Sequence, residues 1–224
     1  MSHQALSREF QRFILLWRYQ HPILPFTFMW RLVLKRMLDV LVAGISLVLA
    51  APLMALVALA IRLDSQGPAF YTQERLGWFG EPFTMLKFRT MHMDAEAAGP
   101  VWACGEADPR ITRVGRILRR LHLDELPQLF NVLGGDMSLV GPRPERPYFV
   151  DTFDRTIPRY DERLLVKPGI TGLAQVSYRY DQSIADVKRK LRLDLLYIKR
   201  MCLTLDLRIL AWTVLVVTTG RGIR

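Results

Sequence analysis

Two neighbouring acidic residues, Asp124 and Glu125, lie in the leucine-rich stretch "RRLHLDELPQLFNVLGGDMSLVGPRPE", residues 119–145. On an α-helix, adjacent side chains point about 100° apart, so the two carboxylates can serve one site without being equivalent. Two close carboxylates make each other harder to ionise, whereas a divalent cation or an arginine restores ionisation. The pair therefore suits a site in which one acid attacks as a nucleophile and the other positions a metal or handles a proton.

Taken alone, the pair has a simpler interpretation, because the first turn of an exposed helix also favours Asp and Glu. The arginines nearby favour chemistry instead. Arg119 and Arg120 precede the pair, and Arg143 lies between two prolines that restrict its backbone, so its guanidinium is presented with little loss of entropy. The sequence has no Walker A, Rossmann glycine, HExxH or GxSxG motif, which removes the usual support for ATPase, dehydrogenase, zinc protease and hydrolase functions. Acid-pair chemistry on a phosphate remains.

The composition also indicates phosphate-bearing partners. The 224-residue chain has a formal net charge of +10, and arginine supplies 25 of its 31 basic residues. Arginine suits bidentate contact with phosphate, so nucleotides, anionic lipid headgroups and nucleic acid are the candidate partners. A bias toward arginine over lysine would explain the ratio but not the excess charge. The two cysteines, Cys104 and Cys202, match no metal-ligand spacing and are too few for a disulfide framework, which favours a reducing compartment.

The longest apolar stretch covers residues 35–64, and the 22 residues from Val40 to Ile61 carry no charge. This length meets the roughly 20 residues that a transmembrane helix requires. Pro52, preceded by Ala51, lies near the middle, where it removes a backbone hydrogen bond and bends a helix. Because basic residues flank both ends, we expect a re-entrant membrane helix that bends at this point and leaves by the face it entered. A kinked helix that spans the bilayer is the alternative, since transmembrane helices tolerate proline.

Both ends of the chain have patterns typical of a membrane surface. Residues 1–34 interleave aromatic rings with arginines. Aromatic and long basic side chains prefer the headgroup region, so this stretch is predicted to be an interfacial N-terminal extension, with a dimerisation arm as the competing interpretation. Residues 207–220 are apolar but too short to span comfortably, and they are predicted to form an amphipathic or buried helix.

The remainder of the chain is predicted to form one domain that begins with a β-hairpin. Strand patterns at Ala69–Gln73 and Phe83–Phe88 are separated by a glycine-rich turn. The hairpin delivers Lys87 and Arg89 at its end, where two cations suit a phosphate but are equally consistent with a solvated basic face. Residues 92–110 are small and weakly patterned and are predicted to be a mobile loop.

Helical patterns follow. From Arg113, apolar residues recur on one face among arginines, and a second short helix is predicted over residues 124–133, ended by two glycines. Residues 183–201 are predicted to form a charged amphipathic helix. These segments predict an α+β chain that is mostly helical, with a re-entrant membrane helix hairpin, interfacial amphipathic helices and a small β-hairpin around one catalytic domain, residues 65–224.

Several blocks of sequence resemble a known family. The apolar segment that starts with "KRMLDVLVAG" is followed by "KFRTM", by "DPRITRVGRILRRLHLDELPQLFNVLGGDMSLVGPRPE" and by "VKPGITGLAQV". In this order and at this spacing, the blocks resemble the bacterial sugar transferases, the monotopic phosphoglycosyl transferases. The likeness runs from about Lys35 to Gly220, and its long central block is highly specific.

The resemblance implies an enzyme that transfers a sugar-1-phosphate from a UDP-sugar to undecaprenyl phosphate and releases UMP. In that family the aspartate of the acid pair attacks the phosphate that carries the sugar. The lipid phosphate then attacks the phosphosugar-enzyme intermediate, so the order of events is ping-pong. Mg²⁺ is the implied cofactor. The reaction is the first membrane step in the synthesis of exopolysaccharide, O-antigen, capsule or glycoprotein glycan.

The motif match implies that Asp124 is the nucleophile and that Glu125 is its catalytic partner. It also implies that Asp124 and Asp206 are the acids of the metal site. Two motifs depart from the family. "SYRYD", around Arg179, differs from the commoner Gly-Arg-Asn form. Ala51-Pro52 stands where the family often has Ser-Pro, so a serine-dependent contact is lost while the bend should remain. The candidate phosphate- and substrate-binding residues are Lys87, Arg89, Arg119, Arg143 and Arg179.

The resemblance also implies a location and partners. The catalytic domain would lie on the cytoplasmic face of the bacterial inner membrane, where UDP-sugar, undecaprenyl phosphate and an anionic lipid bilayer are the partners. A homodimer is a further candidate, and nucleic acid is not expected. On the residues alone two other functions stay open. A basic membrane-tethered adaptor would release no UMP, and a membrane-bound phosphatase with an aspartyl nucleophile would release inorganic phosphate.

Overall fold

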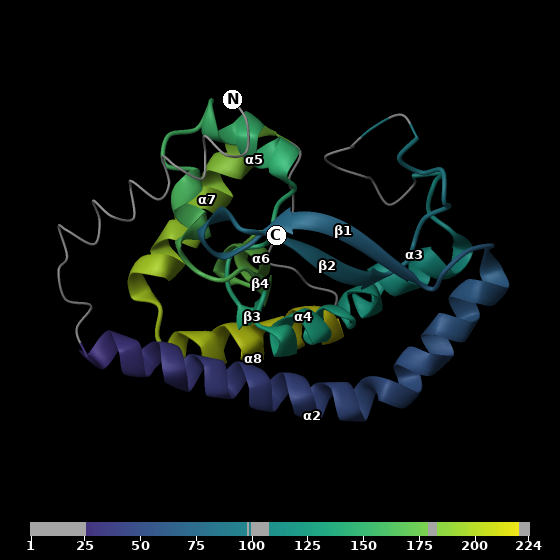
Figure 1. Ribbon diagram of the computed structural model, residues 1–224, viewed down its shortest axis with the longest axis horizontal. Helices are drawn as coiled ribbons and strands as arrows, with labels where there is room; N and C mark the ends of the chain where they lie inside the picture. Colours follow the sequence, from purple (N-terminus) through teal and green to yellow (C-terminus); the bar gives the residue numbers. More distant parts are fainter. Residues whose placement is uncertain (1–25, 98, 100–107, 179–182, 220–224) are drawn as a thin grey trace.

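A computed structural model describes residues 26–97, 99, 108–178 and 183–219 of the chain (Figure 1). The described part is mostly helical with two small sheets, which confirms the predicted α+β class. Figure 1 shows one long helix along one side of the molecule, with the other elements stacked on its inner face.

The elements follow one another in a simple order. The α-helices are α2 (Phe26–Asp64), α3 (Arg113–Arg120), α4 (Gln128–Gly134), α5 (Pro147–Asp154), α6 (Leu173–Ser177), α7 (Ile184–Arg200) and α8 (Leu203–Thr219). The short 3-10 helices are η1 (Trp78–Gly80), η2 (Leu123–Glu125) and η3 (Asp161–Leu165). The strands are β1 (Phe70–Leu76), β2 (Pro82–Phe88), β3 (Ser138–Val140) and β4 (Gly169–Thr171).

Helix α2 is a single helix of 39 residues with Pro52 inside it. Its stretch Trp30–Asp64, with a mean hydropathy of 2.6, is long and apolar enough to cross a membrane by length and composition. Figure 1 shows that the helix changes direction along its length, as the proline predicts. The helix starts nine residues before the predicted boundary at residue 35, because neither proline nor glycine interrupts residues 26–43. The rest of the predicted N-terminal extension lies outside the described residues.

Apolar side chains cover the outward face of α2. Val48, Leu49 and Leu63 are between 75% and 79% exposed, and an exposed apolar surface of this kind is typical of an interaction or membrane-contacting face. Helix α8 shares this character, since Val214 and Leu215 are about 60% exposed while Ile209 on its inner side is fully buried. The prediction of an amphipathic C-terminal helix is therefore wrong in one respect, because the outer face of α8 is apolar too.

Polar residues on the inner face of α2 bind the rest of the fold. Arg36 donates to the carbonyls of Val132 and Leu133, at 2.6 and 2.9 Å, near the end of α4. Asp39, 3% exposed, accepts from the backbone N–H of Leu139 at 3.0 Å. The long apolar helix is thus fixed to α4 and β3, which flank the acid-pair segment on its C-terminal side.

The predicted β-hairpin is confirmed. Strands β1 and β2 are antiparallel, with Phe70 opposite Phe88 and Leu76 opposite Pro82, so β1 extends three residues beyond the predicted Gln73. A second, parallel pair joins β3 to β4. A Cβ on Gly169 would collide with the backbone of Gly141, so this pair requires glycine at the crossing.

The predicted helix over residues 124–133 is wrong in its first part. The acid pair lies in the 3-10 turn η2, and α4 starts only at Gln128. The cause is Pro127, which has no N–H to donate to Leu123, so a continuous α-helix cannot form through this point. The helix predicted for residues 183–201 is confirmed as α7, whose first turn is capped by the Ser183 hydroxyl.

A buried ion pair joins α2 to α8. Lys35 Nζ donates to Asp206 Oδ2 at 2.9 Å and to the carbonyl of Val140 at 3.0 Å. The hydroxyl of Tyr197 donates to Asp206 Oδ1 at 2.7 Å. Both oxygens of the Asp206 carboxylate, which is 1% exposed, are therefore occupied.

Asp206→Asn should lower the free energy of unfolding by about 3 kcal/mol, because it leaves the Lys35 ammonium buried beside a neutral amide. Urea or thermal unfolding in detergent measures the loss. Glu74→Gln, which neutralises an exposed acid on β1, is the matched control and should change stability by less than about 0.5 kcal/mol. Equal stability of the two variants would contradict the role given to the ion pair.

Candidate active site

The acid pair occupies a tight turn. His122 precedes η2 with a left-handed backbone (φ 55°), which is uncommon for a residue other than glycine and marks a sharp change of direction. In a 3-10 turn of about three residues, successive side chains point about 120° apart. Asp124 and Glu125 therefore start from adjacent positions but face different surroundings.

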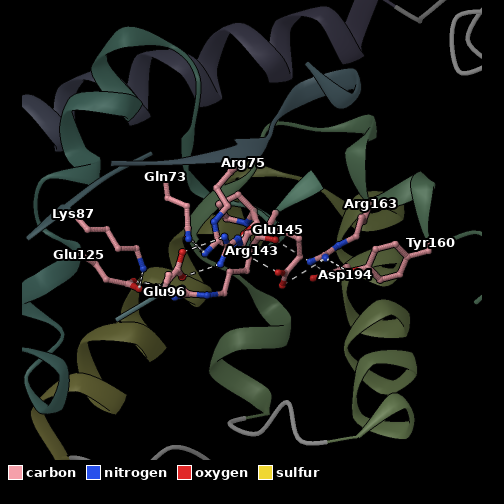
Figure 2. A network of polar contacts seen from close by, with 12 residues as sticks. Gln73, Arg75, Lys87, Glu96, Glu125, Arg143, Glu145, Tyr160, Arg163 and Asp194 are labelled. Carbon is pink, nitrogen blue, oxygen red and sulfur yellow. Dashed lines mark hydrogen bonds and ion pairs between the residues drawn. The ribbon is translucent and has the colours of Figure 1, made fainter. Parts of the chain in front are cut away.

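Glu125 is held between two cations (Figure 2). Its Oε1 lies 3.0 Å from Lys87 Nζ on β2 and 2.6 Å from Arg143 Nη2, and its Oε2 lies 3.5 Å from Arg143 Nη1. The side chains of Glu125 and Lys87 are each only 15% exposed. The Glu125 carboxylate therefore joins three segments that are distant in sequence: the end of β2, the η2 turn and the loop after β3.

Asp124 has a different environment. Among the described residues its carboxylate makes no hydrogen bond or ion pair, although it is half-buried. Burial, and then the charge of Glu125, raise the pKa of Asp124 above its ordinary value, while Lys87, Arg143 and Arg119 act in the opposite direction. The site therefore holds one carboxylate that is committed to cations and one that is available to a substrate or metal.

The cations beside Glu125 lower the pKa of its carboxyl. Burial alone would raise the pKa of the Glu125 carboxyl, but Arg143 and Lys87 outweigh it and hold this pKa well below its usual range. Burial lowers the pKa of Lys87, and Glu125 opposes that shift. The ionised form of Glu125 is therefore favoured, which suits a carboxylate that orients cations.

Arg143 is presented by a rigid backbone. The two flanking prolines fix the chain, and the carbonyls of the four residues from Pro142 to Glu145 all accept hydrogen bonds. Gly169 N donates to Pro142 O at 2.9 Å, and Arg163 Nη2 donates to Arg143 O at 2.9 Å. Arg75 Nη1 donates to Pro144 O at 3.0 Å, and Leu76 N donates to Glu145 O at 2.9 Å. The guanidinium of Arg143 is therefore placed before any substrate binds, which is the condition for electrostatic catalysis.

Two arginines that the sequence analysis missed hold this segment. Arg163, 8% exposed, also donates to Asp194 at 3.0 Å and to the Tyr160 hydroxyl at 2.6 Å. Arg75 lies 3.5 Å from Glu145. No local pattern distinguishes either arginine from a surface one, because their partners come from distant elements.

Two further candidates among the arginines have different positions. Arg119 donates from Nε to the Thr90 hydroxyl at 3.0 Å, and its charge acts on Asp124, so it belongs to the site. Arg89 is 4% exposed, and its guanidinium donates to the backbone carbonyls of Ser65 and Gln66, just after α2. Arg89 therefore completes the end of the long helix, and the structure does not bring it to the acid pair.

The remaining candidates are not brought to the pair either. Arg179, and most of residues 98–107 in the predicted mobile loop, lie outside the described residues. Asp206 is bound to Lys35 and Tyr197, one partner on each carboxylate oxygen, and the metal role expected for it stays a prediction. Within the described ranges, no group of three His, Cys, Asp or Glu side chains could hold a metal.

A Mg²⁺ ion that is shared with a substrate does fit the residues present. Mg²⁺ is commonly bound through one or two carboxylates together with substrate phosphates, and it keeps several waters. Asp124 supplies one such carboxylate, unpaired and half-buried beside cations that attract phosphate. The donor set therefore suits a metal carried in with a phosphorylated substrate.

Comparison with known proteins identifies the family of the chain. Residues 30–220 match the family model described as bacterial sugar transferase. The chain is 46% identical over 191 residues to the UDP-N-acetylgalactosamine-undecaprenyl-phosphate N-acetylgalactosaminephosphotransferase of Aeromonas hydrophila, covering 85% of this chain and 45% of that protein. It is 47% identical over 183 residues to the UDP-glucose:undecaprenyl-phosphate glucose-1-phosphate transferase of Caulobacter vibrioides, covering 80% and 68%.

A third relative is similar in length to this chain. The exopolysaccharide production protein PSS of Rhizobium leguminosarum bv. phaseoli is 39% identical over 197 residues, which cover 85% of this chain and 98% of that protein. The chain thus spans less than half of the Aeromonas relative but nearly all of the Rhizobium one. Because the family model covers most of the chain and includes the acid pair, Lys87 and Arg143, the protein belongs to the bacterial sugar transferase family.

Proposed function

We propose that the protein transfers a sugar-1-phosphate from a UDP-sugar to undecaprenyl phosphate, with release of UMP. The observation that carries this proposal is the unpaired Asp124 carboxylate beside a Glu125 that is neutralised by Lys87 and Arg143. The names of the Aeromonas and Caulobacter relatives describe transfers of this class to undecaprenyl phosphate.

In the first step, a carboxylate oxygen of Asp124 attacks the phosphorus that carries the sugar. The bond from this phosphorus to the bridging oxygen breaks, UMP leaves, and a phosphosugar-aspartyl intermediate remains. In the second step, a phosphate oxygen of the lipid attacks the same phosphorus and releases Asp124. The two half-reactions use one site in turn, which is the ping-pong order.

The cations around the pair offset the repulsion between an anionic nucleophile and an anionic substrate. Lys87, Arg119 and Arg143 lie at or near the acid pair and would hold phosphate oxygens, and the rigid Arg143 segment would stabilise charge that develops during in-line attack. Mg²⁺, when bound with the substrate at Asp124, would neutralise further negative charge on the diphosphate. Glu125 acts by positioning Lys87 and Arg143.

The contacts of α2 favour a re-entrant position in the membrane. Near its start, Arg36 and Asp39 bind α4 and β3, and at its end Asp64 accepts from the backbone N–H of Val114 at 2.9 Å. A straight helix of this length would be about 58 Å long. Because residues on both sides of the uncharged stretch Val40–Ile61 contact the same domain, we infer that the helix enters and leaves by the same face, which would be the cytoplasmic face of the bacterial inner membrane.

This position explains why a membrane helix is joined to the site. The acceptor is a lipid whose phosphate lies in the headgroup plane, so the nucleophile has to be held close to that plane. The exposed apolar faces of α2 and α8 would anchor the domain there, and its excess positive charge would favour anionic headgroups.

Asp124→Asn should lower the rate of UMP release by about 10³-fold or more, because an amide cannot form the phosphosugar intermediate. The assay supplies each of several UDP-sugars with undecaprenyl phosphate. Asp151→Asn, at a half-buried acid on α5, is the control and should keep the wild-type rate. Transfer at the wild-type rate by Asp124→Asn would rule out the nucleophile assignment, and inorganic phosphate in place of UMP would indicate a phosphatase.

The pH dependence should report the pKa of Asp124. Attack requires the ionised carboxylate, so kcat/KM falls as the pH drops through this pKa. Lys87 lowers the pKa of Asp124, so Lys87→Gln should raise this pKa and move the acid limb of the kcat/KM profile to higher pH. Lys188→Gln, at an exposed position on α7, is the control and should leave the acid limb of the kcat/KM profile unchanged. A limb that moves to lower pH in Lys87→Gln would contradict the effect assigned to Lys87.

Cysteine labelling tests the topology. In a chain whose two native cysteines are changed to serine, Arg31→Cys and Gln66→Cys each place a thiol at an exposed position near one end of α2. Both should react with an impermeant maleimide in inverted inner-membrane vesicles and stay unreacted in intact cells with a permeable outer membrane. Labelling of one position from outside and the other from inside would show that the helix spans the bilayer.

A further inference from the structure

Thr90, two residues after β2, contacts α3 through its backbone, and it is buried, with 8% of its surface exposed. Its carbonyl accepts from the backbone N–H of Thr112 at 3.0 Å. The Thr112 hydroxyl in turn caps α3 by accepting from the backbone N–H of Gly115 at 2.9 Å. A Cβ on Gly115 would collide with the backbone of Thr90. The first turn of α3 is therefore packed directly on Thr90 and requires glycine at position 115.

This packing brings the side chain of Arg119 to the Thr90 hydroxyl. Gly115 and Arg119 are four residues apart, so they lie on the same face of α3, about one turn from each other. The Nε–H of Arg119 donates to Thr90 Oγ1 at 3.0 Å, and within the described residues its guanidinium makes no other hydrogen bond or ion pair. An arginine that is held through Nε alone keeps the edge formed by Nη1 and Nη2, whose N–H groups can bind two oxygens of one phosphate.

Arg119 is also joined to the turn that carries the acid pair. Its backbone carbonyl accepts from the N–H of His122 at 3.3 Å, and the His122 carbonyl accepts from the N–H of Glu125 at 3.3 Å. Burial and the charge of Glu125 raise the pKa of Asp124, whereas nearby cations, Arg119 among them, lower it. The guanidinium of Arg119 therefore lies close enough to the acid pair to act on the Asp124 carboxylate.

We propose that Thr90 is a positioning residue, whose hydroxyl fixes the Arg119 guanidinium so that Nη1 and Nη2 bind a phosphate of the donor beside Asp124. The backbone of α3 holds Thr90 before any substrate arrives, so the arginine is oriented in advance. Without the hydroxyl, the long side chain would have to be ordered when the phosphate binds, which costs conformational entropy. The inference rests on the proposed function and adds a residue that acts through Arg119.

Thr90→Val tests the inference, because valine has nearly the shape of threonine and cannot accept a hydrogen bond. We expect kcat/KM for UMP release from the preferred UDP-sugar to fall about 10-fold, since the guanidinium loses its fixed orientation. Thr90→Ser keeps the hydroxyl and should stay within about threefold of the wild-type value. Thr72→Val, at an exposed position on β1, is the matched control and should leave kcat/KM unchanged.

A double-mutant cycle shows whether Thr90 acts through Arg119. Arg119→Met removes every N–H that the hydroxyl could orient, so adding Thr90→Val to it should lower kcat/KM by less than about a further twofold. A further fall as large as that of Thr90→Val alone would show that Thr90 only supports the packing of α3. Wild-type kcat/KM in Thr90→Val would show that the hydroxyl is not needed. Either result overturns the inference and leaves the proposed function intact.

Equilibrium binding of UDP separates a failure of the inference from a failure of the proposed function, because it needs no turnover. The same cycle is measured on the dissociation constant of UDP, which Thr90→Val should raise only when Arg119 is present. If the wild-type chain releases no UMP but this coupling is found, the proposed function fails and the positioning role stands. If Thr90→Val leaves UDP binding unchanged as well, both fail. Thr90→Ala, which also lacks the hydroxyl, carries both measurements if Thr90→Val does not fold.

Discussion

The ion pair of Glu125 with Lys87 and Arg143 is the interaction on which the site depends. A buried carboxylate without partners would be costly, and so would two buried cations without an anion. Their mutual neutralisation lets the end of the hairpin, the η2 turn and the loop after β3 meet at one point. It also leaves Asp124 unpaired in a field of positive charge, which is the condition that a carboxylate nucleophile needs in order to approach a phosphate.

Two layers of support keep this arrangement in place. On one side, Arg75 and Arg163 bind consecutive carbonyls of the segment that carries Arg143, and both arginines are themselves paired with acids. On the other side, Arg36 and Asp39 on α2 bind the end of α4 and the backbone of β3. The long apolar helix and the candidate site residues are therefore parts of one packed unit, which suits the reaction proposed above.

The features that could be predicted from sequence are those with local signals. The hairpin and α7 follow from alternation, glycine turns and helical periodicity, and the nearness of Asp124, Lys87 and Arg143 follows from the resemblance to a family. The turn at η2 was missed because Pro127 prevents the helical bond that the apolar pattern implies. The ion pair of Asp206 could not be foreseen because its partner, Lys35, lies 171 positions away, and the roles of Arg89 and Arg163 are equally set by distant carbonyls. Contacts of this kind leave no trace in the local sequence.

The central claim is that Asp124 carries the phosphosugar between the two half-reactions. Incubating the wild-type chain with its donor in the absence of undecaprenyl phosphate, and then sequencing its peptides by mass spectrometry, tests this most directly. The account predicts a mass increase equal to one phosphosugar on Asp124, which disappears when the lipid phosphate is added. Product formation with Asp124 unmodified throughout, or an adduct on another side chain, would contradict it.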